Sequence, residues 1–331
     1  MELRCLLLGI SIAEAKNRNK SFFYKTNIAY GTNHGLYRFV FLFYLCTNLI
    51  VMTNYGGIPE EFSNLKNAKV VILPVPYDGT STWIKGADKG PEAILEASAN
   101  MELYDIESNR DIYTVGIHTA KPVTEKSSPE KMTEAVYREA KKYVGKQHTV
   151  VIGGEHSVSF GTIKANAETF EDMCVLQFDA HTDLRPEYEH SKYNHACVMA
   201  RAQELCPVIH IGIRSQCIEE QPNVIRENVF FAHEIYNNID WMDKAISRLT
   251  KNVYISFDLD AFDPSILPST GTPEPGGMGW YQVLTFLQKV YEKRNVVGFD
   301  VVELCPNKLN PASDFLASKL IYKMIGYKFK N

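Results

Sequence analysis

Short runs of apolar residues recur along the chain from residue 69 onward, and longer amphipathic stretches separate them. The runs are KVVILPV (69–75), HTVVIGG (148–154), MCVLQFD (173–179), VIHIGIR (208–214), NVYISFD (252–258) and NVVGFDVV (295–302). Each contains few polar residues, which is typical of strands that are buried on both faces. The pattern therefore predicts a mostly parallel sheet.

Amphipathic helices are predicted between these runs. Ser128 can cap a helix whose first residue is Pro129, and apolar residues then recur at helical spacing up to Gly145. Similar patterns cover residues 91–104, 241–249, 281–292 and 312–325. Strands that alternate with helices indicate an α/β fold with helices on both faces of the sheet. Because no repeat or linker interrupts the chain after Val70, we expect residues 52–331 to form a single catalytic domain.

The first fifty residues have a different character. They contain a basic, Asn-rich stretch and an apolar segment at 39–46, which is shorter than the roughly 20 residues that a membrane-spanning helix needs. A basic residue at Arg4, the apolar run after it and small residues at 13–15 leave a secretory signal peptide as an alternative. We favour a translation start at Met52, with residues 1–51 as a poorly ordered extension.

Composition and charge narrow the class of protein. Hydrophobic residues at 45% and charged residues at 22% of 331 positions are typical of a soluble globular protein. Residues 1–52 carry a formal charge of +4 and the remainder carries −8. An acidic body argues against nucleic acid as a partner and is compatible with a cationic substrate. Seven scattered cysteines without metal or redox spacing favour reduced thiols in a cytoplasmic protein, and we expect no membrane partner.

Acidic and histidine residues follow three of the predicted strands. GGEHS contributes Glu155 and His156, FDAHTD contributes Asp179, His181 and Asp183, and SFDLDAFDP contributes Asp258, Asp260 and Asp263. Ligands of a parallel sheet collect beyond the carboxyl ends of its strands, so these three clusters should converge. Residues two apart in an extended segment point the same way, which would let each cluster face one centre.

Carboxylates grouped in this way would repel one another and would be costly to desolvate without positive charge between them. A divalent metal is the simplest source of that charge, and oxygen-rich ligands without cysteine suit Mn²⁺ better than structural zinc. Six side chains are too many for one open catalytic ion but suit two ions that activate water together. The predicted ligands are His156, Asp179, His181, Asp183, Asp258 and Asp260.

Single motifs of this kind have a less specific explanation, because one acidic cluster can simply be solvated or can cap a turn. Three clusters that each follow a buried strand argue against that explanation here. Glu155 is expected to support the metal ligands rather than bind, since its neighbour His156 would point the other way. Asp263 precedes Pro264 and is expected to cap a turn.

The three motifs closely resemble the metal motifs of the arginase/agmatinase ureohydrolases. The resemblance runs from about Tyr55 to the C-terminus and includes PVPYDGTST, GADKGPEAI, TGTPEPGG and VVELCP in family order. It implies a three-layer α/β/α fold around a mostly parallel sheet of about eight strands, two Mn²⁺ per chain, and a homo-trimer or homo-hexamer. The implied ligands are His156, Asp179, Asp183 and Asp258 for one ion, and Asp179, His181, Asp258 and Asp260 for the other.

The resemblance also implies catalytic roles for three residues. His195 in KYNHACV matches a histidine that passes a proton to the leaving amine, and an imidazole titrates near neutrality. Glu303 in VVELCP matches a carboxylate that binds the guanidinium through two charge-assisted hydrogen bonds. Asp183 is expected to accept a hydrogen bond from the attacking water. Taken without the resemblance, His195 could be a surface histidine and Glu303 could form an ion pair at a strand end.

The expected substrate is a small cationic guanidino compound. The loop after DAHTD and the TGTPEPGG segment look like those of agmatinases, and Ser215 stands where arginases have an aspartate. We therefore expect hydrolysis of agmatine to putrescine and urea. Arginine, guanidinobutyrate and other guanidino acids stay open, because Arg185 or Arg214 could pair with a carboxylate. A metal-binding scaffold without turnover is the alternative of a different class.

Overall fold

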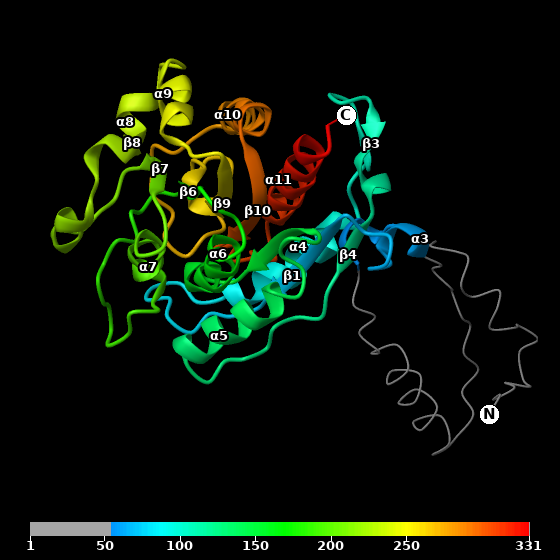
Figure 1. Ribbon diagram of the computed structural model, residues 1–331, viewed down its shortest axis with the longest axis horizontal. Helices are drawn as coiled ribbons and strands as arrows, with labels where there is room; N and C mark the ends of the chain where they lie inside the picture. The colour runs from blue at the N-terminus through cyan, green and yellow to red at the C-terminus, as the bar shows by residue number, and fades with distance from the viewer. Residues whose placement is uncertain (1–53, 331) are drawn as a thin grey trace, which may run out of the picture. The chain divides into compact units, whose positions relative to one another are not determined.

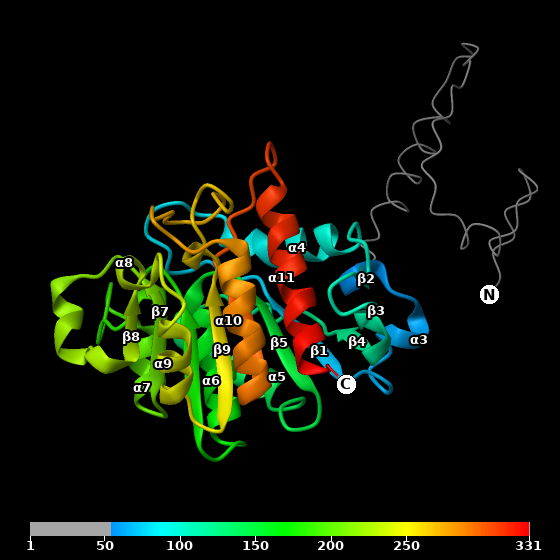
Figure 2. The same cartoon turned by 90° about the horizontal axis from the view of Figure 1, so that it is seen from above.

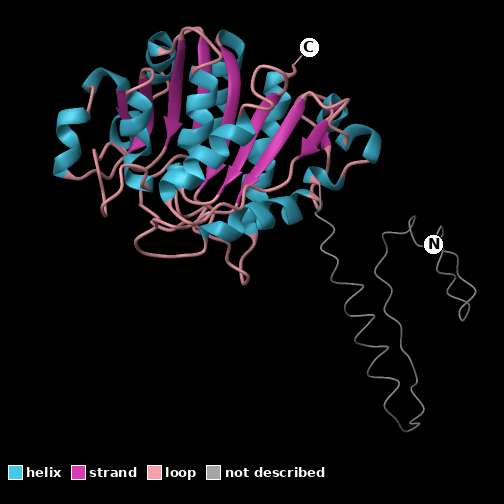
Figure 3. Ribbon diagram, turned by 60° about the horizontal axis from the view of Figure 1, so that its bottom comes forward, coloured by secondary structure: helices cyan, strands magenta, loops and turns pink. Residues whose placement is uncertain are grey.

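The computed structural model describes residues 54–330, whose centre is one sheet of eight parallel strands (Figures 1 and 3). The strand order is β4-β1-β5-β10-β9-β6-β7-β8. The strands are β1 (Val70–Val75), β4 (Ile117–Thr119), β5 (His148–Gly153), β6 (Met173–Phe178), β7 (Val208–Ile213), β8 (Val229–Phe231), β9 (Asn252–Asp258) and β10 (Asn295–Val302). The predicted fold class is confirmed. The extension expected at residues 1–51 lies outside the described residues.

Helices cover both faces of the sheet and give three layers (Figure 2). One face is covered by α4 (Gly90–Ser98), α9 (Trp241–Arg248), α10 (Trp280–Lys293) and α11 (Ala312–Lys328), and the other by α5 (Pro129–Ala140), α6 (Ser159–Ala167) and α7 (Val198–Gln203). Residues 54–330 also contain two short helices, α3 (Glu60–Ser63) and α8 (Ala232–Ile235). Alternate residues of a strand enter opposite layers: in β1, Ile72 packs with the first group of helices and Leu73 with the second.

Local signals set several element boundaries. The Oγ of Ser128 accepts a hydrogen bond from the backbone N of Lys131 at 3.2 Å, and α5 begins at Pro129 as predicted. The helix predicted over 91–104 ends earlier, at Ser98, because the side chain of Asn100 donates to the carbonyl oxygen of Glu96 and caps the last turn. The chain then forms the hairpin of β2 (Tyr104–Asp105) and β3 (Arg110–Asp111). Strands β4 and β8 were not predicted, since each has only three residues.

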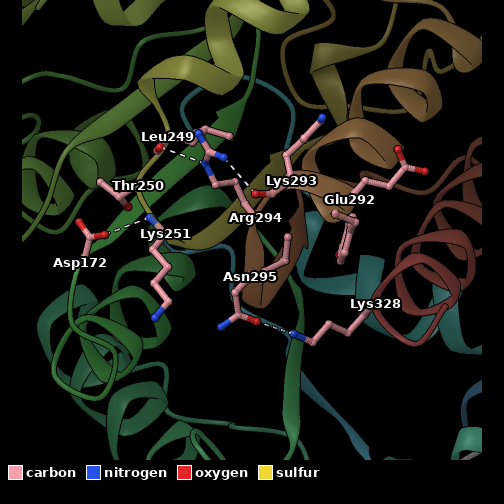
Figure 4. Close-up of a pocket in the computed structure, with 11 residues that line it drawn as sticks. Asp172, Leu249, Thr250, Lys251, Glu292, Lys293, Arg294, Asn295 and Lys328 are labelled. Atoms are coloured by element: carbon pink, nitrogen blue, oxygen red, sulfur yellow. Dashed lines mark hydrogen bonds between the residues drawn. The ribbon is translucent and has the colours of Figure 1, made fainter. Parts of the chain in front are cut away.

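The strands begin at one edge of the sheet, here called the amino edge, and end at the opposite, carboxyl edge. A cavity of about 770 Å³ lies at the amino edge, lined among others by Asp172, Lys251, Arg294 and Lys328 (Figure 4). Arg294 donates to carbonyl oxygens of Ile246 and Leu249, at the end of α9, at 2.8 and 3.1 Å. Cations at helix C-termini complement the helix dipole, which explains this basic lining structurally. Among the helices of residues 54–330, none is both long and apolar enough to cross a membrane.

Candidate metal centre

Three strands in the middle of the sheet, β5, β9 and β6, deliver the predicted ligands to the carboxyl edge, and β10 lies between β5 and β9. His156 opens a 3₁₀ turn, η4 (His156–Val158), three residues after β5. Asp179 directly follows β6, and Asp258 is the last residue of β9, which pairs with β6. Since parallel strands in register end side by side, segments far apart in the sequence meet here. The structure brings all six predicted ligand side chains together.

His156 is the centre of the first group of ligands. Its Nδ1 lies 2.9 Å from Asp183 Oδ2, 3.1 Å from Asp179 Oδ2 and 3.4 Å from Asp258 Oδ2. All four side chains are buried. The candidate ligand atoms of His156, Asp179 and Asp258 lie within 4.8 Å of one another, a spacing that one cation can span.

His181 is the centre of the second group. Its Nδ1 lies 3.0 Å from Asp260 Oδ2 and 3.5 Å from Asp179 Oδ1. The candidate ligand atoms of these three side chains also lie within 4.8 Å of one another. Asp179 belongs to both groups and turns one carboxylate oxygen toward each. Two adjacent cations that share Asp179 would fit this arrangement.

The hydrogen bonds of His156 test whether it fits a metal. Its Nε2 lies 2.9 Å from Ser256 Oγ, and that hydroxyl donates to Asp300 Oδ1 at 2.9 Å. Because the hydroxyl proton is directed to the carboxylate, Ser256 accepts the Nε2 proton, and Nδ1 is the nitrogen that would give its lone pair to a cation after losing its own proton. That Nδ1 is buried and makes no hydrogen bond, although three carboxylate oxygens surround it. An imidazole whose Nε2 is held by a hydroxyl and whose Nδ1 faces three carboxylate oxygens is oriented as a metal ligand would be.

The cluster is short of positive charge. Burial, with the nearby carboxylates of Asp260 and Asp179, raises the pKa of Asp258 well above its usual value. Burial and the charge of Asp179 likewise raise the pKa of Asp183. Burial opposes protonation of His156, but its carboxylate neighbours still raise its pKa well above the usual range. Divalent cations would supply the missing charge, and four carboxylates with two imidazoles suit a hard ion such as Mn²⁺.

Two candidate site residues have an uncommon backbone conformation. Asp183 has a φ of 51° and Glu303 a φ of 66°, values that side-chain-bearing residues rarely adopt. The backbone N of Glu303 donates to the carbonyl oxygen of Gly154, and its Oε1 accepts a hydrogen bond from the backbone N of His156, both at 2.7 Å. The bend at the end of β10 therefore holds the Glu303 carboxylate beside His156, one of the predicted metal ligands.

A cavity of about 280 Å³ joins the cluster to the candidate catalytic residues. Its lining includes His181, Asp183, Asp258, Asp260, His195, Glu303, Arg185, Tyr188, Gln216 and Thr272. His195 opens the 3₁₀ turn η5 (His195–Cys197). Burial, helped by positive charge on His156 and His181, lowers the pKa of His195 to about 4. Its imidazole is therefore neutral at pH 7, as a group that first accepts a proton must be.

Two acidic residues of the motifs lie outside the cluster. Glu155 was expected to support the predicted metal ligands, but its carboxylate forms hydrogen bonds elsewhere. It accepts from Ser157 Oγ at 2.6 Å and from Thr80 Oγ1 at 2.8 Å. The reason is local, because Glu155 caps the 3₁₀ turn that begins at His156 and so faces away from the cluster. Asp263 accepts from three backbone N–H groups, including that of Gly276, so its predicted role as a turn cap is confirmed.

The two arginines considered for a substrate carboxylate differ in their hydrogen bonds. The guanidinium of Arg214 donates to backbone carbonyl oxygens of Gly212, Asp260, Phe262, Glu274 and Pro275. Those bonds use its donors, so Arg214 is a structural group and not a free anion receptor. Arg185 lines the cavity and stacks on the ring of Tyr188 at 4.1 Å. No carboxylate of residues 54–330 forms an ion pair with Arg185.

Comparison with known proteins assigns this chain to a family. The family model described as Arginase family matches residues 68–326. The chain belongs to that family. It is 38% identical to the N(1)-aminopropylagmatine ureohydrolase of Synechocystis sp. over 81% of this chain and 92% of the relative. It is 34% identical to the agmatinase of Pyrococcus horikoshii over 80% of this chain and 93% of the relative.

Solved structures agree with this assignment. The agmatine ureohydrolase of Thermoplasma volcanium superposes with a TM-score of 0.76 at 30% identity, covering 87% of this chain and 98% of that one. The predicted family is thus confirmed. The protein is an arginase-family ureohydrolase, a hydrolase of guanidino C–N bonds close to agmatinase-type enzymes. The family is metal-dependent, and the candidate ligand groups fit that chemistry.

Proposed function

We propose that this protein hydrolyses agmatine to putrescine and urea with two Mn²⁺ per chain. The observation that carries the proposal is a shared cavity: Glu303 and His195 line the same space as the metal-ligand cluster. The proposed ligands are His156, Asp179, Asp183 and Asp258 for one ion, and Asp179, His181, Asp258 and Asp260 for the other. When bound, the ions would neutralise the carboxylates and lower the pKa of the attacking water.

Glu303 is suited to bind the guanidinium. Its Oε1 is held by the backbone N of His156, so the carboxylate cannot swing away from the cluster. Burial and the charge of Glu155 raise the pKa of Glu303 well above its usual value. A guanidinium beside it would reverse that effect by stabilising the carboxylate through charge-assisted hydrogen bonds.

His195 is suited to move the proton that the reaction requires. The water oxygen bonds to the guanidinium carbon, and the bond from that carbon to the alkylamine nitrogen breaks. One water proton must reach the departing nitrogen, because an amine leaves poorly as an unprotonated anion. The neutral imidazole of His195 can accept this proton and then donate it to that nitrogen. Asp183, at the same cavity, can accept a hydrogen bond from the water.

Two other substrates have specific support. Three relatives named N(1)-aminopropylagmatine ureohydrolase share 38% identity with this chain, which favours an agmatine that carries an aminopropyl extension. Arg185, which lines the cavity without a carboxylate partner among residues 54–330, favours a guanidino acid such as 4-guanidinobutyrate. These candidates differ in the charge and length of the tail and not in the proposed chemistry.

The deciding experiment measures urea release by the Mn²⁺-loaded full chain from agmatine, N1-aminopropylagmatine, 4-guanidinobutyrate and arginine. We expect the highest kcat/KM with agmatine. The Arg185→Gln variant should leave KM for agmatine unchanged or lower it, whereas it should raise KM for a guanidino acid. Two bound ions per chain without urea from any of the four compounds would refute turnover and support a metal-binding scaffold.

A further inference from the structure

The segment PVPYDGTST has no role in the proposed chemistry, yet one of its residues contacts the proposed proton carrier. Thr80 follows β1 and is 8% exposed. Its Oγ1 lies 3.1 Å from His195 Nδ1 and 3.0 Å from the backbone N of His195. The same oxygen lies 2.8 Å from Glu155 Oε2. One hydroxyl thus joins a buried carboxylate to both the ring and the backbone of His195.

With Glu155 ionised, the donors and acceptors in this network have one consistent assignment. The carboxylate then only accepts, from the Oγ and backbone N of Ser157 and from Thr80, so the single hydroxyl proton of Thr80 goes to it. The Thr80 oxygen can then only accept from His195, whose Nδ1 must carry the ring proton. Nε2 is left with the lone pair. It is the nitrogen free to exchange a proton within the cavity.

We propose that Thr80, itself oriented by Glu155, is a positioning residue that fixes the tautomer and the ring orientation of His195. The inference rests on the proposed role of His195 as proton carrier. An imidazole in the other tautomer would present a protonated Nε2 and could not accept the water proton, so holding the correct tautomer raises the rate without adding a group that touches substrate. In this way Glu155 and Thr80 serve the imidazole, not the metal ligands.

The test uses Thr80→Val, which keeps the shape of the side chain and removes the hydroxyl, and Thr80→Ser, which keeps the hydroxyl. In the Mn²⁺-loaded full chain, Thr80→Val should lower kcat roughly 10- to 100-fold, with KM for agmatine and metal content unchanged. Thr80→Ser should regain most of the turnover. A crystal structure of the Thr80→Val protein should show the His195 ring rotated from its native position. If Thr80→Val does not fold, Thr80→Ala replaces it in the same comparison.

A double-variant cycle separates this inference from the proposed function. Thr80→Val combined with His195→Ala should be no slower than His195→Ala alone, since both changes remove the same function. Additive losses, or a Thr80→Val protein with native kcat, would overturn the inference and leave the proposed function standing. Full turnover of His195→Ala would instead refute the role of His195 and the inference with it. Absence of urea from every guanidino compound would refute the function.

Discussion

The two edges of the central sheet carry opposite charge for different physical reasons. At the carboxyl edge, four aspartates and two histidines crowd together in the cluster. At the amino edge, the cationic side chains donate hydrogen bonds to neutral acceptors. Arg294 donates to carbonyl oxygens at the end of α9, and Lys328 donates to Asn295 Oδ1 at 2.9 Å (Figure 4). The amino-edge cavity is the larger, about 770 against 280 Å³. The excess of carboxylates over positive charge therefore identifies the candidate metal centre better than cavity volume does.

Burial acts on both edges and has different consequences. At the amino edge, burial lowers the pKa of Lys328, whose Nζ donates a hydrogen bond to Asn295 Oδ1. At the carboxyl edge, burial raises the pKa of Asp258, and the negative charges of Asp260 and Asp179 raise it further. Protonation there would remove negative charge from the six side chains predicted to bind metal. The carboxyl edge is consequently organised for added cations, while the amino edge is complete as it stands.

The strongest test of this contrast removes one carboxylate from each edge. Loss of a residue that supports a metal ligand typically lowers activity 10- to 100-fold, and Asp258 is itself a proposed ligand. Asp258→Asn should therefore lower kcat at least about 100-fold and reduce bound metal below two per chain. Asp172→Asn is the matched control, because Asp172 only accepts a hydrogen bond from the backbone N of Lys251 at the amino edge. Steady-state urea release and elemental analysis measure both. Full activity with two metals in Asp258→Asn would end the metal-centre hypothesis.

Metal removal should destabilise the fold through the carboxyl edge alone. A metal at 100 times its Kd stabilises the folded state by about 2.7 kcal/mol per site, so the Tm of the chelated chain should rise when Mn²⁺ is restored. The rise should shrink in Asp258→Asn and persist in Asp172→Asn. Calorimetry with and without chelator measures the difference. An equal Tm in both conditions would contradict a cation site of this kind.

Much of the site was predictable because strand ends and metal-type residues coincide in the sequence. The route by which the residues converge was not. Asp183 was expected on an extended segment but has a φ of 51°, and Asp260 lies in a 3₁₀ turn, η8 (Leu259–Ala261). The loop around Asp183 is held by Glu220, which accepts hydrogen bonds from Thr182 Oγ1 and the backbone N of Leu184. A contact across 36 residues leaves no local pattern.

Arg214 illustrates the same limit, since the sequence suggested a substrate ligand and the structure shows a clamp. Its guanidinium ties the carbonyl oxygen of Asp260 to that of Glu274, at 2.6 and 2.8 Å. A lysine side chain has one nitrogen, so it cannot also make the bonds that Nε and Nη1 of Arg214 donate to the carbonyl oxygens of Pro275 and Gly212. We expect Arg214→Lys to weaken metal binding roughly 10-fold. The amino-edge counterpart Arg294→Lys should lower the free energy of unfolding by about 1 kcal/mol without changing metal affinity. Metal titration and denaturant unfolding measure the two quantities. Equal metal affinity in the two variants would refute the role of Arg214 as a clamp.

The smallest expected effect belongs to the amino edge and appears only in acid. Burial, helped by the charge of Lys328, lowers the pKa of His148 from 6.5 to about 3. The unfolded chain therefore binds a proton near pH 6.5 that the folded chain refuses, so stability is complete above that pH and falls as pH drops, by about 1.4 kcal/mol per unit. The His148 ring packs beside Phe299 and Phe329, so a phenylalanine can take its place. In denaturant unfolding between pH 6.5 and 5, the His148→Phe variant should show a smaller change of the free energy of unfolding with pH. Its metal content should be native. Identical slopes in the two proteins would show that acid acts mainly at the carboxyl edge.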